Sequence, residues 1–425
     1  MAEGRDRRSK KGRLELYLWV VVISSGFINV NLFWLSWHEE SDSLAQAGSG
    51  SSSFPFSKPS TLTNATATIS GKRLIEEEDP LTQSIRDAGL ANFSLHAKKL
   101  PTWKQVVARF GDHPVVHGLD QCEKYRQQVP MKDRMLGVAG TFNSGTNLMA
   151  ELMMVNCRLP GRQHGTLGKS SGLLWQVNWG KHQPPRYRLQ HKVKEIIDNE
   201  KIMPMVMIRD PYSWLQSMCK RRYSAHWFHV VPKPDTFVSM QPLSYHCPNF
   251  IPTEIERTWF NKSKVFVRQY YGGDPWMVDN VIDKANYTLE SSVIPVRVRY
   301  KVTNEFHDSM AHMWRDWYTE YFNATFPRLI VRLEDLVYNP RNVMKEVCEC
   351  VGGSLAPNLT LLVNSAKKGL GNVHGKIKTG LLDAMFNHVH GNMTAGMTRD
   401  DVLFANAVLN DSPLVSTFGY RLPTT

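Results

Sequence analysis

Residues 135–147 read MLGVAGTFNSGTN, and this stretch decides the fold that the sequence predicts. Its first five residues are an apolar run of strand length, and from Asn147 to Cys157 apolar residues recur at the spacing of one helix face. Between them, Gly140 and Gly145 have the G-x-x-x-x-G spacing of a phosphate-binding loop, whose backbone N–H groups and following helix N-terminus can hold an anion. The stretch therefore predicts a strand, a P-loop-like turn and a helix.

Further apolar runs continue the alternation of strands and helices. More strands of the same sheet are expected over residues 203–208, 295–300 and 328–333, and more helices over residues 102–110, 214–223, 309–323 and 340–351. Apolar strands separated by helices imply a parallel sheet that is covered on both faces. The predicted fold class is therefore α/β, a P-loop-like parallel sheet flanked by helices, with ligand sites beyond the carboxyl ends of the strands.

The N-terminus has the pattern of a membrane anchor. Six Lys and Arg residues within residues 1–13 precede Leu16–Trp37, a stretch of 22 residues without formal charge. At 1.5 Å per residue such a helix can cross a hydrocarbon core of roughly 30 Å, and the basic cluster predicts a cytosolic N-terminus. We expect a cytosolic tail at 1–13 and a transmembrane signal anchor at 14–37. The alternatives are a signal peptide cleaved near residues 45–47 and a buried helix.

The rest of the chain carries signs of a secretory route. Residues 41–72 are rich in Ser, Thr, Gly, Ala and Pro, which predicts a flexible stem over 38–100 before a lumenal domain at 101–425. All six cysteines follow the apolar run, and we expect disulfides or buried thiols rather than zinc, because no Cys-x-x-Cys pair exists; their pairing is open. Eight Asn-x-Ser/Thr sequons also follow it, at Asn64, Asn92, Asn261, Asn286, Asn323, Asn358, Asn392 and Asn410.

The loop itself differs from the loop that binds a nucleoside triphosphate. An ATP or GTP loop continues Gly-Lys-Ser/Thr, whereas this chain has Thr146 at the lysine position and Asn147 at the position that binds magnesium. The loop therefore fits an anion that is bound without a metal. A formal net charge of +12 also favours an anionic partner. For this motif taken alone, a plain helix-capping turn is the alternative.

The loop resembles the 5′-phosphosulfate loop of sulfotransferases, whose Lys/Arg-Ser-Gly-Thr is matched here by Ser144, Gly145 and Thr146. Arg209-Asp210-Pro211 with Ser217 resembles the second signature of that family, which binds the 3′-phosphate of the nucleotide. Residues 331–340 and 418–420 are similar to later segments of the family's domain. The resemblance implies the sulfotransferase fold and the co-substrate 3′-phosphoadenosine 5′-phosphosulfate (PAPS), bound by Asn143, Ser144, Gly145, Thr146, Asn147, Arg209 and Ser217.

The chain departs from the family at one position. Sulfotransferases usually have Lys or Arg immediately before Ser-Gly-Thr, and this chain has Asn143, which brings no charge. The segment after the apolar run 173–179 resembles the Lys-x-His-x-Pro of cytosolic sulfotransferases, although one spacer residue is missing. We therefore expect Lys181 to stabilise the leaving group and His182 to act as the base. Other candidates for the base are Glu151, Glu334 and Asp335, of which the last two are expected rather to cap the following helix.

The resemblance implies a single-pass type II Golgi membrane sulfotransferase with its catalytic domain in the lumen. The expected acceptor is a carbohydrate hydroxyl, with protein tyrosine or a small alcohol as alternatives, and neither a metal nor nucleic acid is expected. Two other classes stay open: a P-loop kinase or NTPase, and a catalytically inactive lumenal protein of the same fold that binds nucleotide or glycan. In cytosolic members a late basic segment contacts the 3′-phosphate, so Lys378 is a further candidate for that contact.

Overall fold

The structure is a computed structural model that describes residues 80–87, 100–190, 198–221, 223–227, 248, 250–251, 293–294, 296–300, 303–361 and 381–424. These residues all lie in one compact unit, Ile75–Thr425. Among them, no helix is long and apolar enough to cross a membrane. The expected cytosolic tail, the expected membrane span Leu16–Trp37 and Lys378 lie outside the described residues.

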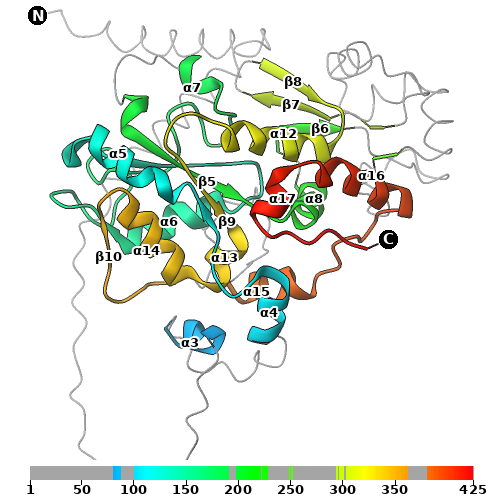
Figure 1. The fold of residues 1–425 in the computed structure, drawn as a ribbon, viewed down its shortest axis with the longest axis horizontal. Coiled ribbons are helices and arrows are strands. Elements are labelled where there is room, and N and C mark those ends of the chain that lie inside the picture. Colours follow the sequence, from blue (N-terminus) through cyan, green and yellow to red (C-terminus); the bar gives the residue numbers. More distant parts are fainter. Residues whose placement is uncertain are drawn as a thin grey trace, which may run out of the picture. The chain divides into compact units, whose positions relative to one another are not determined.

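The centre of the described fold is a mostly parallel sheet (Figure 1). Its strands are β1 (Val116–His117), β9 (Leu329–Arg332), β5 (Ile202–Ile208), β2 (Met135–Gly140) and β4 (Leu173–Leu174), in that spatial order. The edge strand β1 runs antiparallel to β9, and the other pairs are parallel. Gly140 pairs with Met207, and Ile208 pairs with Arg332, so that the carboxyl ends of β2, β5 and β9 lie side by side.

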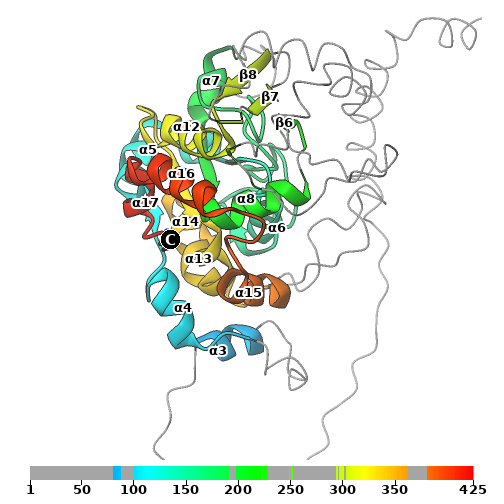
Figure 2. The ribbon, with the colours of Figure 1, turned by 90° about the vertical axis from the view of Figure 1, so that its right-hand side faces the viewer.

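Helices cover both faces of this sheet, as the sequence predicts. Strand β5 is buried throughout, and its alternate residues enter two different apolar clusters, as the two-residue period of a strand requires. On one face pack α8 (Pro211–Lys220), α12 (Met310–Phe322), α16 (Arg399–Asn410) and α17 (Pro413–Thr417). On the other pack α4 (Trp103–Phe110), α5 (Cys122–Gln128), α6 (Thr146–Asn156), α13 (Leu333–Tyr338), α14 (Pro340–Cys350) and α15 (Leu381–His390), as Figures 1 and 2 show.

One expected strand belongs to a different sheet. Residues 296–300 form β7 (Val296–Tyr300), which pairs antiparallel with β6 (Ala225–Trp227) and β8 (Thr303–His307). The prediction that this run extends the parallel sheet is wrong, because its hydrogen-bonding neighbours are these two short strands. A third, two-stranded sheet joins β3 (Cys157–Arg158) to β10 (Ser354–Leu355). Short helices complete the order: η3 (Leu119–Gln121), η4 (Met131–Asp133), α7 (Tyr187–Gln190) and η5 (Asn199–Lys201).

The start of the folded region has two helices. Helix α4 begins after Thr102, the first residue of the expected helix. The Thr102 hydroxyl accepts from the Gln105 N–H, and the Gln105 side chain accepts from the Thr102 N–H. A further helix, α3 (Pro80–Asp87), lies inside the range expected for the stem. Its Leu81 and Ile85 are one helical turn apart and buried in the same apolar cluster as α4. Part of the expected stem therefore contributes to the core.

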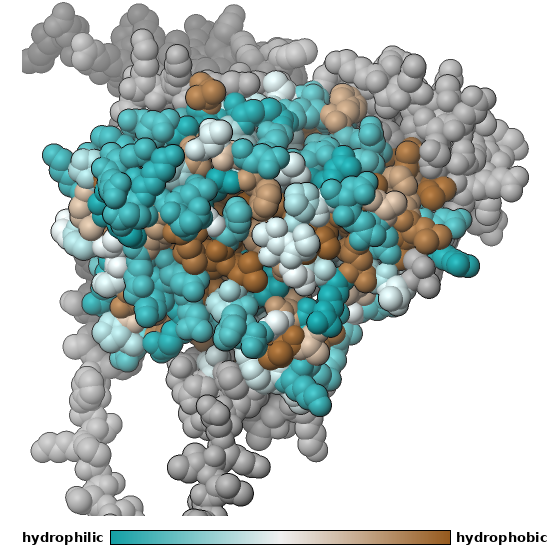
Figure 3. Space-filling model, in the orientation of Figure 1, coloured by the Kyte–Doolittle hydropathy of each residue, from teal (hydrophilic) through white to brown (hydrophobic). Residues whose placement is uncertain are grey.

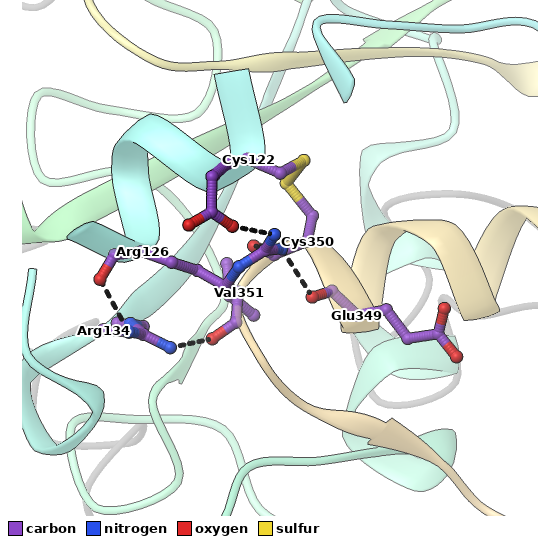
Figure 4. The surroundings of a disulfide bond; sticks show 7 residues. Cys122, Arg126, Arg134, Glu349, Cys350 and Val351 are labelled. Carbon is purple, nitrogen blue, oxygen red and sulfur yellow. Dashed lines mark hydrogen bonds and ion pairs between the residues drawn. A yellow bond between two sulfur atoms is a disulfide. The ribbon is translucent and has the colours of Figure 1, made fainter. Parts of the chain in front are cut away.

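Disulfides hold the end of α14 to two other elements. Cys350 is bonded to Cys122 at the start of α5, and Cys348 to Cys157 of β3. Cys219 is also disulfide-bonded. The expectation of disulfides is thus confirmed. Around the first bond, Arg126 donates to the carbonyls of Glu349 and Cys350 and Arg134 to that of Val351, so that guanidinium groups satisfy the carbonyls at the end of α14 (Figure 4).

The described sequons lie at the surface of the protein. Four sequons fall within the described residues, and the asparagine of each is exposed: Asn323, Asn358, Asn392 and Asn410. On the face drawn in Figure 3, hydrophilic residues cover the region of α5, and apolar residues gather in the middle and around α16.

Candidate functional site

The loop between β2 and α6 lies next to Arg209, at the carboxyl edge of the sheet. The Arg209 Nη1 donates to the carbonyl oxygen of Asn143 at 3.0 Å. Its Nε and Nη2 donate to Oγ of Ser213 at 3.0 and 2.7 Å. The structure therefore brings together the two segments that the sequence singled out for phosphate contacts.

The two glycines of the loop are required by close packing. A Cβ at Gly140 would lie 2.5 Å from Oγ of Ser144 and 2.9 Å from the carbonyl oxygen of Met207. Gly145 has a φ of 85°, and a Cβ there would lie 2.5 Å from Leu333. Within the described residues no side chain caps the start of α6, so its first N–H groups keep the arrangement that suits an anion.

Asn143 has a structural role that the sequence did not indicate. It adopts the left-handed conformation with a φ of 59°, which Asn tolerates better than most residues. Its Nδ2 donates to the carbonyl oxygens of Ser217 at 3.3 Å and Arg221 at 2.8 Å, at the end of α8. An expected hydrogen bond from this amide to a nucleotide would compete with these two bonds.

The serine that contacts Arg209 is Ser213, in the first turn of α8, and the sequence did not indicate it. Ser217 lies near the loop and meets it through its carbonyl oxygen. The signal for Ser213 was available: Asp210 caps α8 by accepting from the Ser213 N–H at 2.8 Å, which orients the first turn beside Arg209.

The backbone of Lys181 lies against the start of the loop. The Gly140 N–H donates to the Lys181 carbonyl at 2.9 Å, so this segment continues alongside the end of β2. The ammonium donates to Oδ1 of Asn147 at 2.8 Å and lies 3.5 Å from the centre of the Trp175 ring. Burial lowers the pKa of Lys181 to about 7, while the negative charge of Glu151 acts in the opposite direction.

His182 is held in one tautomer. Its Nδ1 lies 2.7 Å from the carbonyl oxygen of Gly140, which can only accept, so Nδ1 carries the proton and Nε2 keeps a lone pair. The ring lies 4.7 Å from that of Phe142, and Trp317 fixes the backbone by donating to the His182 carbonyl. Burial lowers the pKa of His182 to about 4, so the imidazole of the free protein is neutral at neutral pH.

The prediction that Glu334 and Asp335 cap the following helix is wrong. Both residues lie inside helix α13, and among the described residues no side chain caps either α13 or α14, the helix expected over 340–351. Glu334 is fully buried and accepts from the Asp210 N–H at 3.0 Å; burial, with the charge of Asp210 second, raises its pKa to about 7. Asp335 instead forms a buried ion pair with Arg332. Both carboxylates therefore bond to residues at the ends of neighbouring strands. Glu151, whose charge acts on Lys181, is the remaining acidic candidate for the base.

No group of three or more His, Cys, Asp and Glu side chains in the described ranges is arranged to hold a metal ion. Comparisons of the chain with protein-family models, with curated proteins and with solved structures found no match. The interpretation of the site therefore depends on its own geometry and on the motifs of the sequence.

Proposed function

We propose that this chain is a PAPS-dependent sulfotransferase with the sulfotransferase fold. One observation supports this most: the glycine loop, the Lys181–His182 pair and Arg209 all meet at the carboxyl edge of the parallel sheet. The contacts that join them are Gly140 to Lys181, Gly140 to His182, and Asn143 to Arg209. Ligands of open parallel sheets bind at this edge.

The nucleotide would be held at two points. The N–H groups of the loop and of the first turn of α6 suit the 5′-phosphosulfate, with Ser144 and Thr146 in the loop. A guanidinium has five N–H donors, and the three contacts that Arg209 makes with described residues leave two for the 3′-phosphate. Ser213 and Ser217, both on α8, are the two serines that follow this arginine in the helix.

The proposed reaction is a direct transfer. The acceptor oxygen attacks the sulfur of PAPS, and the bond from sulfur to the bridging oxygen of the 5′-phosphate breaks, with its electron pair passing to the phosphate. The hydroxyl proton passes to Nε2 of His182. The products are a sulfate ester and 3′-phosphoadenosine 5′-phosphate, and Lys181 stabilises the charge that develops on the leaving phosphate.

The low pKa values of the free protein are compatible with these roles. With a pKa of about 4, His182 is a weak base before the nucleotide binds, and with a pKa of about 7, Lys181 is only partly protonated at neutral pH. PAPS brings several negative charges to the site, and nearby negative charge raises the pKa of both groups. Nucleotide binding would therefore make His182 a stronger base and raise the protonated fraction of Lys181.

The site is proposed to work in the Golgi lumen, with the chain anchored by Leu16–Trp37 as a single-pass type II membrane protein. Disulfides form and persist in oxidising compartments, and the exposed sequons are accessible to glycosylation. Glycosidase treatment of the expressed protein should produce a gel shift of several glycans. A protein that is unshifted and extracted by carbonate would contradict this topology.

The activity can be tested with the purified full chain. Calorimetry should show binding of 3′-phosphoadenosine 5′-phosphate and none of ATP with Mg²⁺, and radiolabelled sulfate should pass from PAPS to a hydroxyl acceptor.

His182→Ala should lower the transfer rate by about 10²–10⁴-fold. Lys181→Ala should lower the rate far more than the nucleotide affinity, and Lys201→Ala, whose ammonium pairs with Asp133, is the control. ATP binding alone would indicate a kinase or NTPase, and nucleotide binding without transfer an inactive protein.

A further inference from the structure

Two exposed aromatic side chains adjoin the candidate site. The described residues include six large apolar side chains that are at least 36% exposed: Leu119, Trp175, Leu189, Tyr223, Phe386 and Leu403. Single exposed apolar residues are ordinary on a protein surface. Trp175 and Tyr223 differ from the others, because Trp175 contacts Lys181 directly and Tyr223 is joined to His182 through one ring, that of Phe142.

Trp175 is 36% exposed and reaches the site through Lys181. The Lys181 ammonium lies 3.5 Å from the centre of the indole ring, a cation–π distance, and donates to Asn147 at the same time. The charge of Glu151 acts on the same ammonium. The ring thus adjoins an ammonium that is itself bonded to an amide and acted on by a carboxylate, so apolar area and hydrogen-bonding groups occur together.

Tyr223 is 41% exposed and reaches the site through Phe142. The two rings are parallel to within 11° at 5.5 Å, and Phe142 lies 4.7 Å from the His182 ring, so three rings lead from the surface to the proposed base. Tyr223 also has a φ of 53°, and the described chain contains one other non-glycine residue with a positive φ, Asn143 of the loop. Strained backbone of this kind persists where the surroundings hold it, often at functional sites.

We propose that Trp175 and Tyr223 form the acceptor platform of this site and that they bind a sugar ring, an inference that rests on the proposed sulfuryl transfer. A pyranose has an apolar C–H face, which an aromatic ring can remove from water, and a rim of hydroxyls. Lys181, Asn147 and Glu151 supply hydrogen-bonding partners for that rim. A wholly apolar acceptor would desolvate these polar groups without offering them any further hydrogen bond, which disfavours it.

Binding can be measured without turnover. Saturation-transfer NMR is carried out on the full chain in the presence of 3′-phosphoadenosine 5′-phosphate. The sugar probes are galactose, N-acetylglucosamine, glucuronic acid and lactose, and a tyrosine peptide represents the competing class of acceptor. We expect a sugar signal that Trp175→Ala and Tyr223→Ala abolish, that Trp175→Phe retains, and that Phe386→Ala leaves unchanged. Phe386 is 37% exposed on α15 and matches Trp175 in exposure.

Kinetics then assign the role. With a sugar acceptor, Trp175→Ala should raise the acceptor KM by about tenfold or more and leave the KM for PAPS unchanged, as loss of a binding surface predicts. Three outcomes would each overturn the proposed acceptor platform: no sugar signal, a signal for the tyrosine peptide alone, or an acceptor KM that Trp175→Ala does not change. Sugar binding without nucleotide binding would overturn the sulfotransferase proposal and leave the sugar site standing.

Discussion

At the scale of single residues, the protonation of Lys181 governs the proposed chemistry. The ammonium must be charged to stabilise a leaving phosphate, yet burial lowers its pKa to about 7. Because kcat/KM reports the free protein, its pH profile should fall on the alkaline side with an apparent pKa of about 7. Glu151 raises the pKa of Lys181, so Glu151→Gln should move that fall to lower pH.

The control for this profile is Glu349→Gln, at the end of α14, which should leave the alkaline limb where it is. An alkaline limb that does not move in Glu151→Gln would show that another group titrates there.

Arg209 allows a second test at this scale. Arg209→Ala removes a charged donor from the proposed 3′-phosphate contact, which should weaken binding of 3′-phosphoadenosine 5′-phosphate by roughly ten- to a hundred-fold, or about 1.5–3 kcal/mol. Adenosine 5′-phosphosulfate has no 3′-phosphate and should bind as before. Calorimetry measures both ligands, with Arg315→Ala, a partly exposed arginine paired to Asp316, as the control. Equal weakening of the two ligands would make Arg209 structural.

At the scale of elements, Asn143 joins the glycine loop to the end of α8. Asn143→Gly should keep the left-handed backbone but lose both hydrogen bonds to the helix-end carbonyls, at about 1–3 kcal/mol of unfolding free energy. Asn143→Ala should lose about 1–2 kcal/mol more, because a Cβ disfavours this conformation and no amide compensates. Denaturant unfolding of both variants measures the difference, and equal stabilities would argue against backbone strain.

The sequence was informative about the local elements around this site. The periodicity of residues 135–157 predicted β2 and α6 to within a residue at each end, and α14 was expected over 340–351 and found at Pro340–Cys350. Strand length, helix period and caps are local properties, which explains this success.

Features that depend on distant contacts were not predictable. Strand β7 was expected, but its neighbours β6 and β8 decide which sheet it joins. Asp335 resembled a cap, yet its partner Arg332 is buried where it donates to the carbonyls of Phe110 and Phe418, from opposite ends of the domain. Likewise, the serine that contacts Arg209 is Ser213 and not Ser217, because the Asp210 cap holds the first turn of α8 beside that arginine.

At the scale of the whole molecule, two disulfides cross-link distant parts of the chain, and their contributions should depend on each other. Their sequence separations are 228 and 191 residues, so when one bond exists the other closes a ring of only 37 residues, the difference between the two. By chain entropy, losing either bond first should cost about 3–4 kcal/mol and losing the second about 5 kcal/mol.

Serine double variants of each pair and the quadruple variant, compared by denaturant unfolding, measure this coupling. The quadruple variant should lose more stability than the two double variants added together. If the stability losses of the two double variants add up to that of the quadruple variant, the two disulfides do not share a ring in the way proposed here.

The same separations determine when the central sheet and the native disulfides can be completed during synthesis of the chain. Strand β9 lies between β1 and β5, so the sheet cannot be completed until residues near 332 have emerged. Cys157 precedes its partner Cys348 by 191 residues, which at roughly 5–20 residues per second is a delay of about 10–40 s on the ribosome. Throughout that delay Cys122 and Cys157 are neighbouring thiols without their native partners. In an oxidising compartment they can join each other, and a disulfide isomerase must then reopen that bond before either cysteine can bond to α14.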